Sequence, residues 1–560
     1  MKKVFLVIGI VLITFTSCNF TTEVTEKKTV VNYKTAENEI ILSTDSPLTE
    51  QITQTRKVYV IRDGFDLKQG ILELPENVTL KFIGGYIYNG TVKFNNTDIS
   101  GYASFSNCSY QGTLSNSRVE LSWFNVEDGK TSNVNLGRGN VTVNTHDAAK
   151  IQQIIDCCPS GCSVYIDKVY FTRQPITIKG KISFKGIDAS EGVYATMLKN
   201  VEYGFNGIMN NTVFVVEAGG DISMQGISVI GNLNLYIGGN LWEKCSSGGS
   251  SLSNPYTLCG IDLKQGATIT EIHDSSFVGF TYGIRSSGGI IRLIKNSYFS
   301  SNRYGFWAEN TNVCELRGCR LNSNLLNFHF YERNLHYINS SDKDPTLETD
   351  AADIAKLGGG LYLKNCANVN VINCRFEFNF IHVILDQANK NIDIHNAIFD
   401  TGTLSQVMIN NQAVNNPENY SASNPAFSNV KINSCTFARG ARCDVQGQDS
   451  KPGFGIFYIC DKGNRGSDVS ITNNIISDDM EVDKTITVFY EDNIFDIYNT
   501  STSGTGYTVT GNSFYSAAAT KVYNVIDDSS GTFNINASGN SYGGLTKKSG
   551  KTDVLHITER

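Results

Sequence analysis

Short stretches in which apolar and polar residues alternate recur along the chain from about residue 260. In each stretch two apolar residues flank one other residue, so every second side chain can turn to the same side of a strand. The first apolar residues follow one another at intervals of 23, 22, 22, 33, 22 and 24 residues. They are Ile261, Ile284, Phe306, Phe328, Leu361, Val383 and Val407. A period near 22 predicts a solenoid that adds one coil per repeat.

A second phrase, apolar-x-Asn-x-x-Phe, lies between these stretches, as in Ile294–Phe299, Val371–Phe376 and Ile394–Phe399. Stacking such coils about 4.8 Å apart buries a continuous core and pairs the backbone groups. The asparagine of the phrase is predicted to hydrogen-bond its equivalent in the next coil, as a ladder. The interval of 33 contains an excess of 11 residues, which fits the polar insert Asn334–Lys356. Leucine-rich repeats are excluded, because their fixed leucines and helical returns are missing.

The pattern resembles the pectin-lyase-like superfamily of right-handed parallel β-helices, over residues 145 to 540. Asp147–Asp156 is similar to the short amphipathic helix that caps the first coil in many members. Ser163–Ile166 and Ile176–Gly186 follow in the expected order. Tyr59–Phe124 resembles an N-terminal module of Bacteroides-type β-helix proteins and of some phage tail proteins. The resemblance implies an all-β fold, a right-handed single-stranded parallel β-helix preceded by a small β-rich module.

The N-terminus predicts export. Lys2 and Lys3 precede an apolar run, Val4–Ile13, that is too short to span a bilayer and is typical of a signal peptide. Phe15–Cys18 resembles the lipobox of bacterial lipoproteins, in which the thiol of Cys18 is linked to diacylglycerol. The protein is then held at the outer membrane or cell surface by its lipid. The alternative is an ordinary secretory signal with an incidental cysteine.

These features divide the chain into six parts. We expect a signal peptide at 1–18, a flexible tether at 19–56, a β-rich module at 57–125, a capping segment with a short helix at 126–175, the β-helix at 176–545 and a tail at 546–560. The tether is expected from its Thr, Glu and Lys content and its few aromatic residues.

Composition agrees with short strands and tight turns, since the chain has 51 Gly and only 9 Pro. Charged residues are 18% and the net charge is −7, which argues against a nucleic-acid partner. Of the 14 cysteines, three form a column, each two residues before an inward apolar residue. They are Cys319, Cys374 and Cys435, and we expect them to stack in the core. Bridges are plausible in two other groups, one of Cys157, Cys158 and Cys162 and one of Cys245 and Cys259. No cysteine spacing fits zinc.

Alternation places the neighbours of the inward residues on the solvent side of one sheet. The nearer outward column is Asp262, Arg285, Trp307, His329, Tyr362, Ile384 and Met408. The next is Lys264, Ser287, Glu309, Tyr331, Lys364, Asp386 and Asn410. The simplest interpretation is a polar sheet surface in water. The functional interpretation is a surface that holds an extended glycan along the helix axis.

In the functional interpretation, Trp307 and Tyr362 are flat platforms for sugar rings, two coils apart with His329 between them. Arg285 holds a carboxylate or sulfate group. His329 with Tyr331 abstracts and returns a proton, as β-elimination of a uronic acid requires. The candidate catalytic residues are His329, Tyr331, Lys364, Glu309 and Asp386; the candidate binding residues are Trp307, Tyr362 and Arg285.

Hydrolysis requires two carboxyl groups about 5–9.5 Å apart. The repeat count puts Glu309 and Asp386 three coils apart, about 14 Å, which is too far unless the insert bends the register. The other pair left open is Glu332 or Asp386 with an acid from a loop. Family motifs give no help. Asn96-Thr97-Asp98 matches a polygalacturonase motif but lies in the N-terminal module, and Arg292–Lys295 follows no Gly-His-Gly. Neither a metal site nor a motif that requires a cofactor is found.

Two hypotheses from different classes remain. One is a surface enzyme, lyase or hydrolase, that acts on extracellular polysaccharide. The other is a non-catalytic glycan-binding or adhesive β-helix, phage tail-like in origin. In both, the partners are an extracellular glycan and, through the lipid, the membrane.

Overall fold

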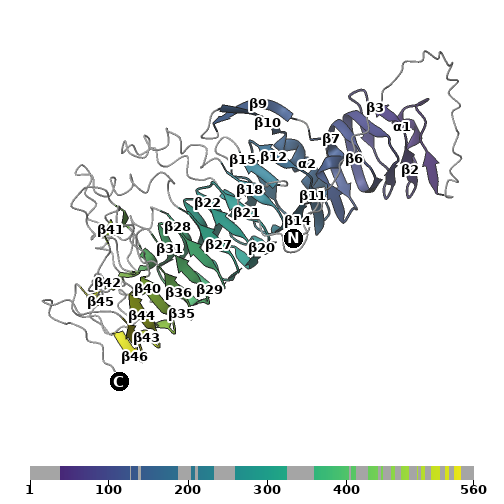
Figure 1. Ribbon diagram of the computed structural model, residues 1–560. Helices are drawn as coiled ribbons and strands as arrows, with labels where there is room; N and C mark the ends of the chain where they lie inside the picture. The colour runs from purple at the N-terminus through teal and green to yellow at the C-terminus, as the bar shows by residue number, and fades with distance from the viewer. Residues whose placement is uncertain are drawn as a thin grey trace, which may run out of the picture.

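The computed structural model describes residues 38–126, 128–135, 140–186, 204–207, 212–231, 259–324, 358–400, 402, 405–410, 427–438, 443–444, 456–460, 468–478, 488–489, 493–497, 506–516, 524–528 and 535–543. Figure 1 shows an elongated coil of strands that runs from β2 at one end to β46 at the other. Three long sheets, all with parallel strand pairs, form its sides. The parallel β-helix predicted from the period is therefore confirmed.

Sheet I has 13 strands. They are β8 (Arg118–Glu120), β11 (Cys162–Ile166), β14 (Lys181–Gly186), β17 (Asp221–Gln225), β20 (Thr268–His273), β23 (Ile290–Lys295), β26 (Cys314–Arg317), β29 (Ala367–Ile372), β32 (Lys390–His395), β35 (Ser428–Asn433), β39 (Asp468–Thr472), β43 (Gly506–Thr510) and β46 (Ile535–Ser538).

Sheet II has 12 strands. They are β12 (Val169–Thr172), β15 (Gly204–Gly207), β18 (Ser228–Ile230), β21 (Ser276–Val278), β24 (Tyr298–Ser300), β27 (Arg320–Asn322), β30 (Arg375–Glu377), β33 (Ile398–Asp400), β36 (Thr436–Ala438), β40 (Ile475–Asp478), β44 (Ser513–Ser516) and β47 (Ser541–Gly543).

Sheet III has 11 strands. They are β13 (Ile176–Ile178), β16 (Phe214–Val216), β19 (Cys259–Leu263), β22 (Tyr282–Ser287), β25 (Tyr304–Glu309), β28 (Gly359–Lys364), β31 (Ile381–Asp386), β34 (Ser405–Asn410), β38 (Phe457–Cys460), β42 (Asn493–Ile497) and β45 (Asn524–Asp528). The chain passes through sheets I, II and III in turn, so each coil contributes one strand to each sheet. A short antiparallel pair, β37 (Cys443–Asp444) and β41 (Val488–Phe489), lies outside them.

The N-terminal module is also built from parallel strands. They are β1 (Glu39–Ile41), β2 (Val58–Ile61), β3 (Gly64–Asp66), β4 (Ile71–Glu73), β5 (Thr79–Phe82), β6 (Tyr86–Gly101) and β7 (Phe105–Leu114), with a helical turn α1 (Leu48–Gln51). The expected tether, 19–56, is wrong for residues 38–56. There β1 pairs with β2, and Leu42, Leu48 and Ile52 are buried because they belong to the hydrophobic core.

The predicted capping helix is α2 (Ala148–Cys157). It begins where the Asp147 carboxylate accepts hydrogen bonds from the backbone N–H groups of Ala149 and Lys150, a typical N-cap. Its apolar side is buried, and Gln152 exchanges two hydrogen bonds with the backbone of Thr177 in β13. A helical turn η1 (Leu121–Phe124) precedes it, as do the antiparallel strands β9 (Asp128–Asn135) and β10 (Asn140–His146). No helix among the described residues is long and apolar enough to cross a membrane.

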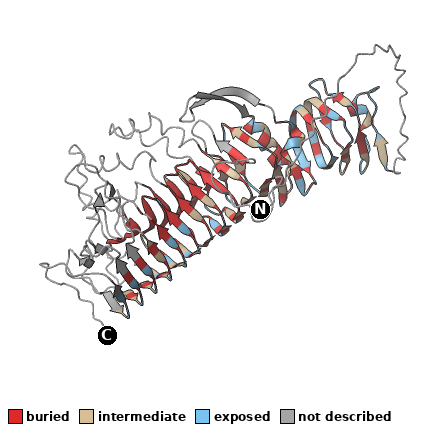
Figure 2. Ribbon diagram, viewed as in Figure 1, coloured by how far each residue is buried: buried red, intermediate tan, exposed pale blue. Residues whose placement is uncertain are grey.

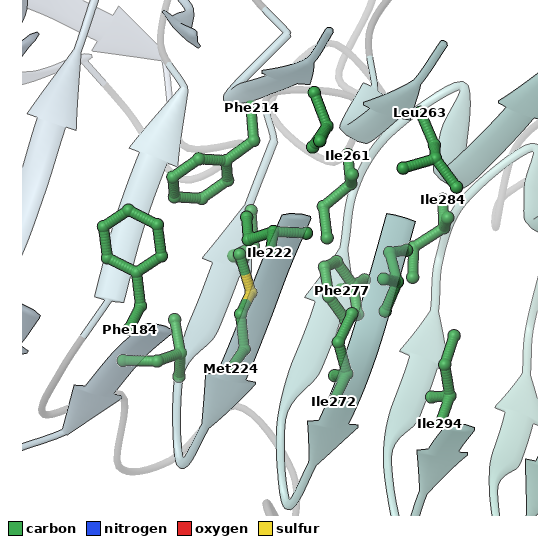
Figure 3. Close-up of a cluster of buried hydrophobic side chains, with 14 of the residues drawn as sticks. Phe184, Phe214, Ile222, Met224, Ile261, Leu263, Ile272, Phe277, Ile284 and Ile294 are labelled. Atoms are coloured by element: carbon green, nitrogen blue, oxygen red, sulfur yellow. The ribbon is translucent and has the colours of Figure 1, made fainter. Parts of the chain in front are cut away.

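The inward register predicted from alternation is confirmed. Six of the seven residues of the sheet III column have no exposed surface, namely Ile261, Ile284, Phe306, Leu361, Val383 and Val407. Figure 2 shows buried residues along most of the coil, and Figure 3 shows Ile261, Ile284 and Phe277 in one cluster of buried hydrophobic side chains. The seventh, Phe328, lies outside the described residues.

The number of coils predicted from the sequence is wrong by one. Phe306 of β25 pairs directly with Leu361 of β28, so no strand can lie between them in sheet III. The alternating phrase at 327–330, which predicted an extra coil, lies outside the described residues and adds no strand between β25 and β28 in sheet III. An alternating apolar pattern cannot by itself establish that a stretch forms one of the stacked strands.

The asparagines of the turns have two separate roles. Those of the repeated phrase take left-handed backbone angles, with φ of 49° at Asn296 and 52° at Asn396, which asparagine tolerates better than most residues. A buried ladder runs through another turn, between sheets II and III. There the Asn302 amide donates to Asn324 Oδ1 at 3.1 Å, and the Asn324 amide donates to Asn379 Oδ1 at 2.9 Å.

A ladder also forms in the turn of the phrase itself, one residue further on, in the last coils. There the Asn474 amide donates to Asn512 Oδ1 at 3.0 Å and the Asn512 amide donates to Asn540 Oδ1 at 3.1 Å. The ladder was thus predicted at the right turn for these coils, but one residue too early.

The predicted cysteine column is confirmed. Cys319, Cys374 and Cys435 are each 1% exposed and carry free thiols in the core. Cys158 and Cys162 also carry free thiols, and each lies in contact with the other. Cys245, the expected partner of Cys259, lies outside the described residues.

Candidate functional site

The outward side chains of sheet III form the candidate site, here called the sheet III face. In register along its first column stand Asp262, Arg285, Trp307, Tyr362, Ile384 and Met408. Along its second column stand Ser287, Glu309, Lys364, Asp386 and Asn410. Long connections enter or leave this sheet at several coils, for example between β27 and β28 and between β34 and β35. The strands themselves position every residue named here.

The missing coil brings the candidate residues closer together than the sequence predicted. Trp307 and Tyr362 are in register on neighbouring strands, and their rings stack with centroids 3.6 Å apart and planes 9° apart. His329 therefore cannot stand between them on this sheet. His329 and Tyr331 lie outside the described residues, so the expected proton-transfer pair stays a prediction.

The two carboxyl groups also move closer. Glu309 pairs with Lys364, and Lys364 pairs with Asp386. The acids are thus two strand spacings apart, about 9.6 Å along the axis, and the predicted three-coil separation is wrong. Lys364 is on β28, the strand between those that carry Glu309 and Asp386. Its Nζ lies 3.8 Å from Glu309 Oε1.

Outward orientation does not mean exposure on this face. Arg285, Trp307, Glu309 and Lys364 are half-buried. Several residues that were expected to face solvent are buried, namely Asp262, Tyr362, Ile384, Asp386, Met408 and Asn410. For Tyr362 the reason is visible, since the rings of Trp307 and Tyr304 lie against it. Tyr362 is therefore not a sugar platform itself but a support for Trp307.

Asp386 is a buried carboxyl group on the face, with a raised pKa. It is 1% exposed, it accepts a hydrogen bond from the Tyr362 hydroxyl on Oδ2, and it accepts another from the Asn410 amide on Oδ1 at 3.0 Å. Burial raises the pKa of Asp386 to about 6, against the lowering effects of Tyr362 and Lys364. Burial and the neighbouring Asp386 raise the pKa of Tyr362 as well, so its phenol stays protonated and donates the hydrogen bond.

The cations of the face are already paired with carboxylates. Arg285 donates from Nε to Asp262 Oδ1 at 3.1 Å and from Nη2 to Asp262 Oδ2 at 3.3 Å. Lys264 Nζ also contacts Asp262, at 2.7 Å. Arg285 is thus fixed in place with 26% of its side chain exposed, and its positive charge is shared with Asp262. The role of Arg285 in holding a ligand carboxylate stays a prediction.

Two aromatic residues of the site were missed in the sequence, Tyr282 and Tyr304. Their rings stack at 5.7 Å, and the Tyr304 ring meets Trp307 edge-on at 4.6 Å. Tyr282 also contacts Trp307 at 5.3 Å and is half-buried. Both tyrosines stand two residues before an inward residue, Ile284 or Phe306, so their equivalent places in consecutive repeats were a usable signal. The result is an aromatic cluster of Tyr282, Tyr304, Trp307 and Tyr362.

The raised pKa of Asp386 predicts a pH effect on stability. The folded state binds the proton more tightly than the unfolded state, so Asp386 contributes stability that is full below pH 4 and is lost as the pH rises through about 6. Lowering the pH from 7 to 5 should therefore stabilise the wild type by about 1 kcal/mol relative to Asp386→Asn. Chemical denaturation of both proteins at the two pH values measures this.

The comparison with Asp386→Asn is necessary because His382 acts in the opposite direction. Its pKa is lowered to about 3 by burial, so its contribution is lost as the pH falls. His382 is present in both proteins and cancels. An equal response of the two proteins to pH would show that the pKa of Asp386 is not raised in the folded protein.

Among the described residues, no three His, Cys, Asp or Glu side chains converge in a way that could hold a metal ion. Asp98, from the motif that matched polygalacturonases, lies on β6 in the N-terminal module, far in sequence from the sheet III face.

Comparison with known proteins identifies no family. No family model matches the chain, and no curated protein matches it. Among solved structures, it is similar to the catalytic unit of a GH87 α-1,3-glucanase from Streptomyces thermodiastaticus, with 12% identity over 71% of this chain and a TM-score of 0.35. The chain spans 61% of the length of that glucanase unit.

Two further structures are similar to it. One is an alginate lyase from a Paenibacillus species, with 11% identity, 72% of this chain and 96% of the lyase covered, and a TM-score of 0.21. The other is tailspike gp49 of Acinetobacter baumannii bacteriophage Fri1, a capsular polysaccharide depolymerase, with 11% identity, 93% and 65% covered, and a TM-score of 0.24. At such TM-scores these likenesses carry no argument about activity, and function has to be argued from the site.

Proposed function

We propose that the protein is a cell-surface β-helix that binds an extracellular polysaccharide on the sheet III face. The observation that carries the proposal is a chain of contacts from buried to exposed side chains. Asp386 accepts from the Tyr362 hydroxyl, and the Tyr362 ring stacks on Trp307. Trp307 is thereby held in one orientation before any ligand arrives, which is the preorganisation that a binding site needs.

The surroundings of Trp307 suit a sugar. A half-buried aromatic residue offers apolar surface to the C–H face of a sugar ring. Glu309 and Lys364 lie on the next outward column with about a third of each side chain exposed, 30% and 32%. An acceptor and a donor beside an aromatic ring can bond adjacent hydroxyl groups. Each coil adds about 4.8 Å along the axis, roughly the length of one saccharide unit, so successive coils can contact successive sugars.

A second candidate function is glycoside hydrolysis, and one observation favours it. A carboxyl with a pKa of about 6 can hold a proton near neutral pH, as a general acid must. Glu309 is about 9.6 Å away along the axis, close to the separation of about 6.5–9.5 Å found in inverting enzymes. Against it, Asp386 is 1% exposed and both its oxygens accept hydrogen bonds within the protein. We therefore assign Asp386 a positioning role.

One assay separates these functions. The purified protein is run through native gels that contain neutral or acidic polysaccharides, and the same polymers are incubated with it in solution. Binding alone predicts retardation in at least one polymer without new chain ends. Hydrolysis would add reducing ends, and elimination would add ultraviolet absorbance from unsaturated ends. A protein that is retarded by none of the polymers and cleaves none of them would contradict both candidates.

We propose that the anchor of this surface protein is a lipid on Cys18, which lies outside the described residues. The support is the short apolar run before Phe15–Cys18. Wild-type protein should incorporate a fatty-acid probe and sediment with membranes, and Cys18→Ala should do neither. Cys108→Ala is a control, because Cys108 is buried in the N-terminal module and should not affect labelling. Labelled Cys18→Ala protein would refute the lipid anchor.

A further inference from the structure

A second charged cluster lies on sheet II, on a different side of the coil. Tyr298, Arg320 and Arg375 are in register on β24, β27 and β30. Asn322, Glu377 and Asp400 are in register two residues further along the strands. The two arginines stand directly opposite each other on neighbouring strands, about 4.8 Å apart. Like charges in that position destabilise a sheet unless something compensates them.

Glu377 compensates both arginines. Its side chain is only 4% exposed, and each of its two oxygens contacts a different guanidinium. Arg320 donates to Oε2 from Nε at 2.7 Å, with Nη2 at 2.5 Å from the same oxygen, and Arg375 Nε contacts Oε1. Arg375 Nη2 is also 4.0 Å from Asp400. One buried carboxylate therefore fixes two guanidinium groups side by side.

The arginine side chains remain open to solvent on their outer side. Arg320 is 41% exposed and Arg375 is 50% exposed. The Arg320 guanidinium lies 5.9 Å from the centre of the Tyr298 ring, which restricts it further. A guanidinium has five N–H donors, and the contacts to Glu377 and Asp400 use only Nε and Nη2. Two planar donor groups held one coil apart suit an acceptor with several oxygens.

We propose that Arg320 and Arg375 form an anion clamp, which binds a carboxylate or sulfate group on the polysaccharide. The protein as a whole has a net charge of −7, which repels an acidic polymer. The fixed pair of arginines supplies local positive groups that can bind such a polymer. The clamp lies on the same coils as the sheet III face, since only residues 378–380 separate Glu377 from the strand that carries Asp386. The polymeric nature of the ligand rests on the proposed function; the anion site does not.

The competing explanation is that the three charges only satisfy one another. Replacing the arginines alone would leave Glu377 buried without a partner and would destabilise the protein for that reason. The test variant is therefore Arg320→Gln/Arg375→Gln/Glu377→Gln, which removes all three charges together. The matched control is Glu315→Gln/Arg317→Gln on sheet I, where an arginine with 55% exposure pairs with a carboxylate at 2.6 Å.

The full-length proteins are compared in native gels that contain dextran sulfate, polygalacturonate or neutral dextran, and their thermal midpoints are measured. We expect the wild type to be retarded by dextran sulfate, polygalacturonate or both, the triple variant to bind that polymer about tenfold more weakly, and the control to match the wild type. Which polymer retards the protein tells sulfate from carboxylate.

Three results would overturn the clamp: no retardation of the wild type by either polyanion, a triple variant that matches it, or a control that loses as much. If the triple variant does not fold, Arg320→Lys/Arg375→Lys keeps the charges but removes the planar forks and should lose the same retention. Trp307→Ala separates this proposal from the previous one. If the triple variant loses retention and Trp307→Ala does not, the anion site is supported and the sheet III site is contradicted.

Discussion

Val371→Asp should lower the free energy of unfolding by several kcal/mol. Val371 has no exposed surface and points into the core from β29, with strands stacked on both sides. A carboxylate there has no partner among the apolar side chains of neighbouring coils, so it must either remain charged at high cost or take up a proton. Urea denaturation of the purified protein measures the difference from the wild type.

The neighbouring residue provides the control. Asn370 lies on the same strand, points outward and is exposed, so Asn370→Asp adds the same charge on the opposite face. It should change the free energy of unfolding by no more than about 0.5 kcal/mol. Equal effects of the two substitutions would mean that β29 is not inserted with the register described here.

Trp307→Ala should weaken binding of the retained polysaccharide by about tenfold to a hundredfold. The substitution removes the aromatic surface that Tyr362 supports, and losses of about 1.4 to 2.8 kcal/mol correspond to those factors. The measurement is the dependence of gel mobility on polymer concentration. Glu309→Gln, which keeps the shape and one hydrogen-bonding oxygen, should have a smaller effect if the protein only binds and should abolish turnover if it hydrolyses.

Tyr165→Ala is the matched control for Trp307→Ala. Tyr165 is a half-buried aromatic residue on the outer side of sheet I, and the Arg118 guanidinium lies 4.1 Å from its ring centre. Its loss should remove aromatic surface without affecting glycan retention. A comparable loss in both variants would show that exposed aromatic residues contribute non-specifically and that the sheet III face has no special role.

The inward register could be predicted because side chains alternate with a period of two. Once Ile261 was placed inward, Ile284 and Phe306 followed from the repeat, and the structure places all three in the core. The number of coils could not be predicted as safely. A stretch such as 327–330 satisfies the local pattern, and only the pairing of Phe306 with Leu361 shows that it adds no strand to sheet III.

The candidate site was predicted in part. Trp307, Tyr362 and Asp386 were chosen for their outward positions, and the structure brings them together. Their separate roles depend on contacts between coils, which a count along the chain cannot supply. One extra coil in the count was enough to separate Glu309 from Asp386 and Trp307 from Tyr362.

The anion clamp was missed for a similar reason. Arg320, Arg375 and Glu377 come from two strands that are far apart in the sequence, with 325–357 between those strands. Each residue alone is an ordinary outward charge on a short strand. Only the parallel pairing of β27 with β30 places the two arginines opposite each other and Glu377 within reach of both.

Tryptophan fluorescence tests most directly whether a glycan binds at Trp307. The chain has three tryptophans, so Trp123→Phe/Trp242→Phe leaves Trp307 as the single emitter. Titration with the polysaccharide that retards the protein should shift or quench its emission, with half of the change at the concentration that half-retards it in the gel. Emission that stays constant while the polymer is bound would contradict the proposal that the sheet III face is the binding site.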